Sequence, residues 1–253
     1  MPQADLPRLY ELTAHEHVDS LLLEARRMAR AGADEGTVVW ALEQDARAPN
    51  PDGGWTPQPG GLACAFILRP EDPAPVAAQI GLVATVALTN AVAELVAPMT
   101  TLHCGWPGDI VLGGRKAGQV TLDAAVGDAG DVKWLNVLVE VNVRAPVDQV
   151  DLSHVYLQFD GHCDVTPQQL LEQFSREFLT WLDRWANEGF ASIRTAWLHR
   201  AGGAGQPVEV PIADGTLAGT LTDLDADGRL VVETDAGARR LSLPPLGPNP
   251  PGA

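Results

Sequence analysis

The feature that most constrains the fold is a long apolar segment, PVAAQIGLVATVALTNAVAELVAP, at residues 75–98. Its length is enough to span a lipid bilayer. It is also rich in alanine and carries polar side chains along its whole length, namely Gln79, Thr85, Thr89, Asn90 and Glu94. We therefore predict a helix over about 75–97 that is buried in a protein core.

Helical and strand patterns alternate around this helix. The stretch SLLLEARRMARAGADEG places Leu22, Ala25 and Ala29 on one helical face. Short apolar and β-branched runs predict strands at 37–43 and 62–69, and Gly- and Asp-rich turns divide residues 100–144 into further strands. This mixture predicts an α/β (α+β) fold in which helices back a mixed sheet.

A second helical region begins at TPQQLLEQFSREFLTWLDRWANEG. Thr166 is a predicted N-cap, and Pro167 occupies the first helical position. Leu170, Phe174 and Phe178 recur at four-residue spacing, so one stripe of the helix should face the core. A shorter helix, FASIRTAWLHRA, follows.

The pattern changes at GGAGQP, residues 202–207, which we interpret as a joint between domains. Apolar and polar residues then alternate over 207–243, with turns at DG, DADG and DAG, as in a small meandering barrel. The sequence thus predicts a first domain over 1–200 and a small β domain over 207–243 that the first does not need in order to fold. The Pro-rich tail 244–253 is predicted to be disordered.

Composition narrows the function. The 253 residues include 33 acidic and 17 basic side chains, a formal net charge of −16. Nucleic acids and anionic membranes are therefore poor partners, because both attract clustered Lys and Arg. The N-terminus has no basic region followed by an apolar one, and the widely spaced Cys64, Cys104 and Cys163 include no Cys-x-x-Cys, so we expect a cytoplasmic protein with reduced thiols.

One short stretch suggests a binding site. GWPGDIVLGGRKAG, residues 105–118, holds Lys116, one of only two lysines in the chain, just after a Gly-Gly turn. A solvated hairpin lysine would explain this placement. The other interpretation is that Lys116 holds an anionic ligand.

The order of elements and this stretch resemble the biotin protein ligases and their lipoate ligase relatives. GWPGDIVLGGRKAG is similar to that family's Lys-Trp-Pro-Asn-Asp segment and its Arg-Lys-x-Ala-Gly hairpin, and VDSLLLEARRMARAGADEGTVVWALEQ and DADGRLVVET are further similar stretches. The resemblance implies a class II-type mixed sheet with helices and a C-terminal SH3-like small β-barrel. It also implies chemistry in which ATP and Mg²⁺ convert biotin or lipoate to an acyl-adenylate, and the acyl group passes to a lysine of a carrier protein.

The same resemblance implies a set of site residues. Lys116 falls where the family has the lysine that contacts the biotin carboxylate and the adenylate phosphate. Other matching positions surround the ligand: Ser20 for biotin, Gln44 and Trp55 at the two ends of the phosphate loop, Arg47 within it, Trp106, Arg115 and Gly118 around the hairpin, and Asn142 on the adenine side.

This sequence departs from the family mainly where the nucleotide would bind. Between Gln44 and Trp55 it reads DARAPNPDGG instead of a Gly/Arg-rich loop, so phosphate-binding cations and backbone donors are lost. Leu21 and Leu22 replace polar biotin contacts, and Gly105 and Gly108 replace the lysine and asparagine that flank Trp-Pro. On a late strand, Leu138 and Glu140 replace two glycines beside the nucleotide.

We therefore expect a ligase-like protein that binds a small acyl or carboxylate ligand without efficient ATP-dependent biotinylation. The alternatives are a functional biotin or lipoate ligase, which would use ATP, Mg²⁺ and a carrier protein, and a scaffold without a small ligand. The pairs His103-Cys104 and His162-Cys163 lack metal-ligand spacing, so we predict no metal site in them. DLDADG resembles the start of a calcium loop, but without the later glutamate it predicts a hairpin turn.

Overall fold

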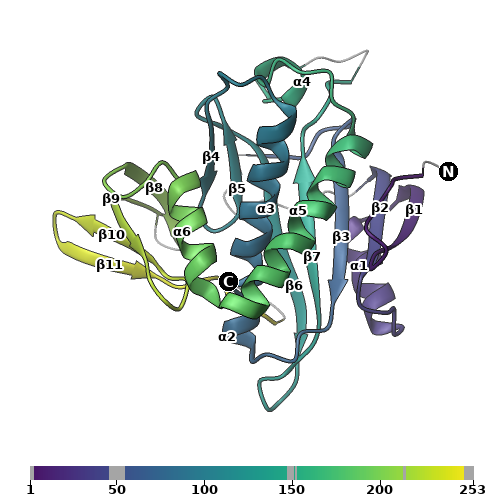
Figure 1. Ribbon diagram of the computed structural model, residues 1–253, viewed down its shortest axis with the longest axis horizontal. Helices are drawn as coiled ribbons and strands as arrows, with labels where there is room; N and C mark the ends of the chain where they lie inside the picture. The colour runs from purple at the N-terminus through teal and green to yellow at the C-terminus, as the bar shows by residue number, and fades with distance from the viewer. Residues whose placement is uncertain (1–2, 46–54, 147–150, 152, 213–214, 248–253) are drawn as a thin grey trace.

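The computed structural model describes residues 3–45, 55–146, 151, 153–212 and 215–247. They form a seven-stranded mixed sheet with helices on both faces, and a smaller four-stranded sheet beside it (Figure 1). This is the predicted α/β (α+β) arrangement.

The large sheet places strands from distant parts of the chain next to one another. Its spatial order is β1 (Glu11–Val18), β2 (Thr37–Gln44), β3 (Leu62–Leu68), β7 (Val132–Val141), β6 (Arg115–Val126), β5 (Asp109–Leu112) and β4 (Leu102–Gly105). β1 and β2 are parallel, and the other neighbouring strands are antiparallel.

The helices divide between the two faces of this sheet. In chain order they are α1 (Leu21–Arg30), α2 (Ala74–Ala77), α3 (Ile80–Leu95), α4 (Leu157–Asp160), α5 (Pro167–Glu188) and α6 (Phe190–Arg200). α3 and α5 pack on each other and on one face (Figure 1), whereas α1 packs against β2, β3 and β7 on the opposite face. We call this second side the α1 face.

The predicted apolar helix lies at the centre of the core. The segment Ala74–Leu95 is long and apolar enough to cross a membrane, yet 78% of its most apolar 18-residue stretch is buried inside the protein. The prediction of a buried core helix is thus confirmed, with one difference. The segment is divided into α2 and α3, and residues 78–79 lie between them.

α5 starts as predicted. Thr166 accepts a hydrogen bond from the backbone N–H of Gln169, and the Gln169 side chain binds back to the backbone of Thr166, which forms a capping box. Further along, Phe174 and Phe178 are fully buried and meet Phe66 of β3 edge to face, with ring centroids 5.3 and 5.5 Å apart. These rings join α5 to the middle of the sheet.

The C-terminal residues form an antiparallel meander of four strands in the order β11-β10-β9-β8. The strands are β8 (Pro207–Ile212), β9 (Gly215–Leu224), β10 (Leu230–Thr234) and β11 (Gly237–Leu241). Among the described residues, β8 and β11 do not pair, so the expected small β domain is an open ladder. Its buried side chains, Val210, Leu221, Leu224, Leu230 and Val232, join the same hydrophobic cluster as α3 and α5.

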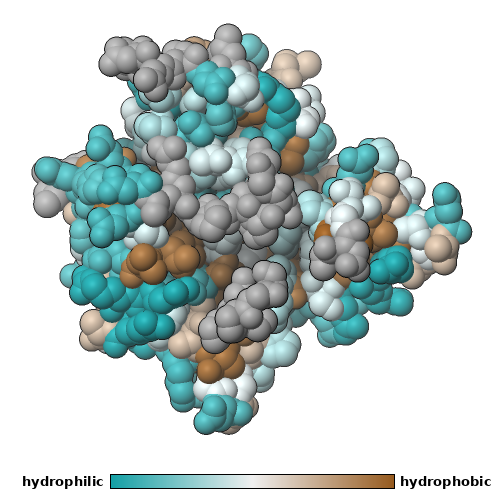
Figure 2. Space-filling view, turned by 180° about the vertical axis from the view of Figure 1, so that it is seen from behind, coloured by the Kyte–Doolittle hydropathy of each residue, from teal (hydrophilic) through white to brown (hydrophobic). Residues whose placement is uncertain are grey.

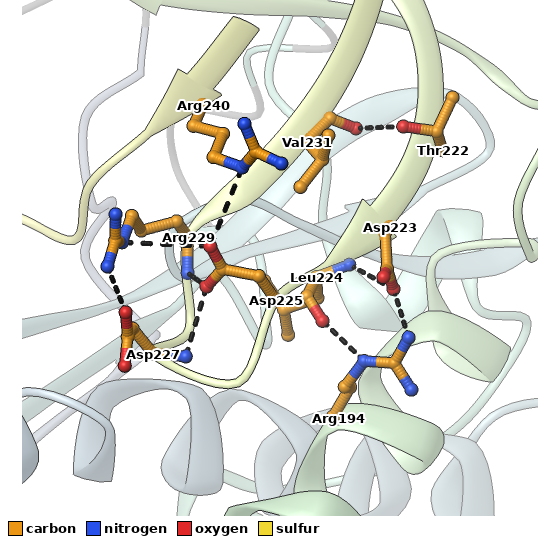
Figure 3. Close-up of polar contacts among 9 residues, drawn as sticks. All are labelled: Arg194, Thr222, Asp223, Leu224, Asp225, Asp227, Arg229, Val231 and Arg240. Atoms are coloured by element: carbon orange, nitrogen blue, oxygen red, sulfur yellow. Dashed lines mark hydrogen bonds and ion pairs between the residues drawn. The ribbon is translucent and has the colours of Figure 1, made fainter. Parts of the chain in front are cut away.

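The DLDADG segment is a hairpin turn, as predicted (Figure 3). One Asp225 carboxylate oxygen accepts from the backbone N–H groups of Asp227 and Arg229 at 3.0 and 2.9 Å. Beside this turn, Arg194 of α6 donates to the Leu224 carbonyl and pairs with Asp223, which attaches the small sheet to the larger domain.

Truncation after Arg200 should leave a soluble fragment that melts cooperatively, because the seven-stranded sheet keeps α1, α3, α5 and α6. The melting temperature should fall, since α6 loses the partners of Arg194 and part of the shared cluster becomes exposed. Thermal melts followed by circular dichroism test this. An aggregated or dye-binding molten product would instead show that the small sheet completes the main core.

Candidate functional site

A row of directly paired residues crosses the α1 face of the large sheet. From β1 to β5 it runs through His15, Ala41, Ala63, Glu140, Gln119 and Asp109. Paired residues project from the same face, so this row brings two carboxylates and an amide together. Figure 2 views the molecule from this side and shows hydrophobic residues gathered near the middle of it, among hydrophilic ones.

Lys116 reaches this face through a β-bulge. Ile110 pairs with Gly118 but Val111 pairs with Lys116, so Ala117 is an extra residue whose side chain points into the core. The bulge reverses the alternation and turns Lys116 toward the face that carries Asp109. The preceding Gly-Gly turn has positive φ at both Gly113 and Gly114, which favours glycine there.

Lys116 is not a solvated hairpin lysine, because its side chain is only 20% exposed. Its Nζ lies 2.7 Å from Oδ1 of Asp109 and 5.5 Å from the ring centroid of Trp55. The structure thus brings Lys116 and Trp55 together, as the resemblance implied. It also supplies an internal carboxylate that already pairs with the lysine charge.

Glu140 forms the most buried polar contact of the row, with 2% of its surface exposed. Its Oε1 accepts from Nε2 of Gln44 at 3.0 Å, and its Oε2 accepts from Nε2 of Gln119 at 3.1 Å. Gln44 in turn accepts from the backbone N–H of Leu21 through its Oε1, at 3.2 Å. One carboxylate therefore links β2, β6, β7 and the start of α1.

Asn142 and Trp55 add buried donors to the same region. Asn142 has no exposed surface. Its Oδ1 accepts from the backbone N–H of Gln58 at 2.8 Å, three residues after Trp55 in the chain. Asn142 Nδ2 and Trp55 Nε1 are buried and have no hydrogen-bond partner among the described residues. Such donors can serve an acceptor on a ligand.

Several other predicted site residues have local structural roles. Arg115 pairs with Asp160 of α4 at 2.9 Å. A Cβ on Gly118 would lie 2.8 Å from the carbonyl oxygen of Glu140, so glycine permits close pairing of β6 and β7. Trp106 precedes a cis proline, and its indole N–H has no partner among the described residues. Arg47 lies outside the described residues.

Two cavities lie at the carboxyl ends of β1 and β2. One of about 260 Å³ is lined by residues that include Ala41, Gln44 and Ala63. The other, of about 420 Å³, is lined by residues that include Ser20, whose hydroxyl caps α1 by accepting from the N–H of Leu23 at 3.4 Å. Gln44 and Ser20 thus line cavities, whereas Lys116 lines neither of these two.

Sequence reasoning missed His17, which lines both cavities. Its Nε2 lies 2.9 Å from Oδ1 of Asp45, and this contact raises the pKa of His17 above its usual 6.5. His17, Asp19 and Asp45 each place one ligand atom within 4.8 Å of the others, although all three are exposed. Parallel pairing of β1 and β2 creates this cluster, and only the alternating HEH pattern in the sequence hinted at it.

The cysteines offer no activated nucleophile. Cys104 is buried, its thiol donates to the carbonyl of Trp197, and burial raises its pKa to about 12. Burial also raises the pKa of Cys64 and Cys163. A thiol reacts as its thiolate, so these shifts disfavour covalent catalysis.

Comparisons with known proteins identify relatives of this chain. Residues 54–199 match the biotin/lipoate A/B protein ligase family, and residues 203–243 match the biotin protein ligase C terminal domain. The chain is 30% identical over 224 residues to the biotin–[acetyl-CoA-carboxylase] ligase of Paracoccus denitrificans, covering 87% of this chain and 92% of that protein. It is 28% identical over 241 residues to the bifunctional ligase/repressor BirA of Bacillus subtilis (strain 168), covering 91% and 71%.

Solved structures show the same fold. A biotin protein ligase-like protein of unknown function from Silicibacter sp. TM1040 has a TM-score of 0.76 at 25% identity, covering 95% of this chain and 97% of that one. Biotin protein ligase from Aquifex aeolicus in complex with biotin and ATP has a TM-score of 0.71 at 20% identity, covering 92% and 96%.

Asp45→Asn should bring the pKa of His17 back toward 6.5, because the hydrogen bond that His17 donates to the Asp45 carboxylate is the largest cause of its rise. A raised histidine pKa means that the contact stabilises the folded state below about pH 6.5 and that this stabilisation is lost as the pH rises through the folded-state pKa. Titration of the histidine resonances by NMR measures the change. An unaltered His17 titration in the variant would contradict the assignment.

Proposed function

The chain belongs to the biotin/lipoate A/B protein ligase family, and on that premise we propose that it binds a small carboxylic acid on its α1 face without efficient ATP-dependent biotinylation. In this proposal the protein has lost the nucleotide half of the site and has kept a carboxylate-binding half.

The loss of the nucleotide half is supported above all by the buried carboxylate of Glu140. Its carboxylate is buried on β7, at one of the two positions where the resemblance implies glycine beside the nucleotide. At a separation of about 6 Å and an effective dielectric constant near 20, two like unit charges repel by roughly 3 kcal/mol. An ionised Glu140 would therefore disfavour a nucleotide phosphate on this face. Leu138, the other replaced glycine, packs in the small hydrophobic cluster beneath α1.

The carboxylate-binding half is supported by Lys116 and its surroundings. Lys116 lies against the Trp55 ring, and the unpartnered donors of Trp55 and Asn142 belong to the same region. A cation beside N–H donors that lack a partner suits a carboxylate. Because Asp109 already pairs with Lys116, a bound acid would compete with this internal carboxylate, which favours moderate affinity.

A second candidate is a functional biotin–protein ligase. The 30% identity with the Paracoccus denitrificans ligase over 87% of the chain favours it. In that case ATP and Mg²⁺ would be required, and a carrier protein would be the partner. A cytoplasmic location suits both candidates, as do the three free cysteines.

Calorimetry separates the two candidates. The intact protein should show no micromolar binding of ATP·Mg²⁺, because Glu140 and the loop sequence oppose phosphate, whereas at least one of biotin, lipoate and octanoate should bind. Each compound is titrated separately, and a biotin carrier domain is then offered with ATP·Mg²⁺ and biotin. Micromolar ATP binding together with labelling of the carrier domain would refute the first candidate and establish the second.

Lys116→Met should weaken binding of the carboxylic acid about tenfold or more, because it removes a charge-assisted hydrogen bond worth roughly 1.5–3 kcal/mol. The melting temperature should change little. Lys133→Met is the matched control: it removes the other lysine, whose side chain is 62% exposed and pairs with Asp131. Equal affinities for the wild type and Lys116→Met would eliminate Lys116 from the site.

A further inference from the structure

Three side chains at the ends of β1 and β2 place metal-binding atoms next to one another. His17, Asp19 and Asp45 each offer one ligand atom, and these atoms all lie within 4.8 Å of one another. The backbone holds them there, because His17 pairs with Glu43 in the parallel ladder and the N–H of Asp45 donates to the carbonyl of Val18 at 3.2 Å. Ligand atoms on one Zn²⁺ ion lie roughly 3–3.5 Å apart, since each bond is about 2.0–2.2 Å long. Small rotations of these exposed side chains therefore suffice to close the set around one ion.

The charges of this cluster also suit a divalent cation. Among the residues that the structure describes, neither Asp19 nor Asp45 pairs with a lysine or an arginine, and Asp45 pairs with His17 at 2.9 Å. Glu24, which lines the neighbouring cavity, differs in this respect, because Arg27 already pairs with it at 2.6 Å. Two carboxylates this close repel each other unless a cation lies between them. With His17 neutral, one divalent cation balances the two carboxylate charges.

A second histidine adds a nitrogen donor from the same strand. His15 and His17 are two residues apart on β1, so their side chains project from one face, and both line the cavity of about 420 Å³. Nε2 of His15 is buried and has no hydrogen-bond partner among the described residues, and it lies 3.7 Å from Oε1 of Glu24. Buried polar atoms are normally paired, so a metal ion or a water bound to that ion would satisfy this nitrogen.

We propose that His17, Asp19 and Asp45 bind one divalent metal ion of the Zn²⁺ class, with His15 as a further nitrogen donor. Imidazole ligands favour Zn²⁺ and similar ions, whereas Mg²⁺ and Ca²⁺ prefer sites built from oxygen ligands. The ion would lie where the two cavities meet, because His17 lines both, Asp45 lines the cavity of about 260 Å³ and Asp19 lines the other. The metal site stands apart from the proposed function, since Lys116 lines neither cavity, and it would remain if no carboxylic acid bound.

The test is titration of Zn²⁺ into the intact protein after treatment with EDTA, at about pH 8, where an ordinary histidine is neutral. Calorimetry should give one bound ion per chain, with Mg²⁺ bound about a hundredfold more weakly or less. His17→Gln and Asp45→Asn should each weaken Zn²⁺ binding about tenfold or more, because each variant removes one ligand of the ion. Co²⁺, used as a spectroscopic probe, should show visible d–d bands without the charge-transfer bands that cysteine ligands cause.

His103→Gln is the matched control. It removes another exposed histidine, on β4 at the opposite edge of the sheet from β1, and should leave the Zn²⁺ affinity unchanged. Because the substituted side chains are all exposed, each metal-free variant should melt close to metal-free wild type, which shows that it has folded. Absence of Zn²⁺ binding to wild type, or wild-type affinity in both His17→Gln and Asp45→Asn, would overturn the proposal. Cobalt–sulfur charge-transfer bands, or an equal loss of affinity in His103→Gln, would overturn it as well.

Discussion

A buried carboxylate needs hydrogen-bond donors, and the arrangement of the α1 face depends on the donors that bind the carboxylate of Glu140. Each of its oxygens accepts from a glutamine amide, one on β2 and one on β6, while Glu140 itself lies on β7. The β2 glutamine also accepts from the first residue of α1. Because these contacts cross strands that are distant in sequence, they fix the sheet and the first helix at the place where a ligand would bind. Leaving any one of these groups unsatisfied would cost about 1–3 kcal/mol.

The described cations of the predicted site are paired within the protein. Lys116 pairs with Asp109 and Arg115 with Asp160, so two cations that the resemblance assigns to a ligand already have carboxylate partners. Among the described residues of the predicted site, the buried donors without a hydrogen-bond partner are neutral and include the Asn142 amide and the indole N–H groups of Trp55 and Trp106. This balance suits a small, singly charged acid better than a triphosphate, which needs several free cations or a metal ion.

Much of the fold could be predicted from local sequence patterns. The buried apolar helix, the capped start of α5 at Thr166 and the alternating C-terminal strands all depend on neighbours within a few residues, and each is found in the structure. The split between α2 and α3 and the open ladder of the small sheet were not foreseen, because both depend on packing against distant elements.

The site was harder to predict, for a physical reason. The partner of Lys116 depends on a bulge at Ala117 that reverses which face the lysine occupies, and periodicity cannot reveal a bulge. Glu140 was predicted to oppose a nucleotide, but its two amide partners lie 96 and 21 residues away in sequence. Ser20 was predicted to contact the ligand, and the structure uses its hydroxyl to cap α1.

The most direct test is biotin-dependent exchange of pyrophosphate into ATP, which reports formation of an acyl-adenylate without any carrier protein. We expect no exchange above the protein-free background, and exchange at a rate typical of active ligases would contradict the loss of the nucleotide half of the site.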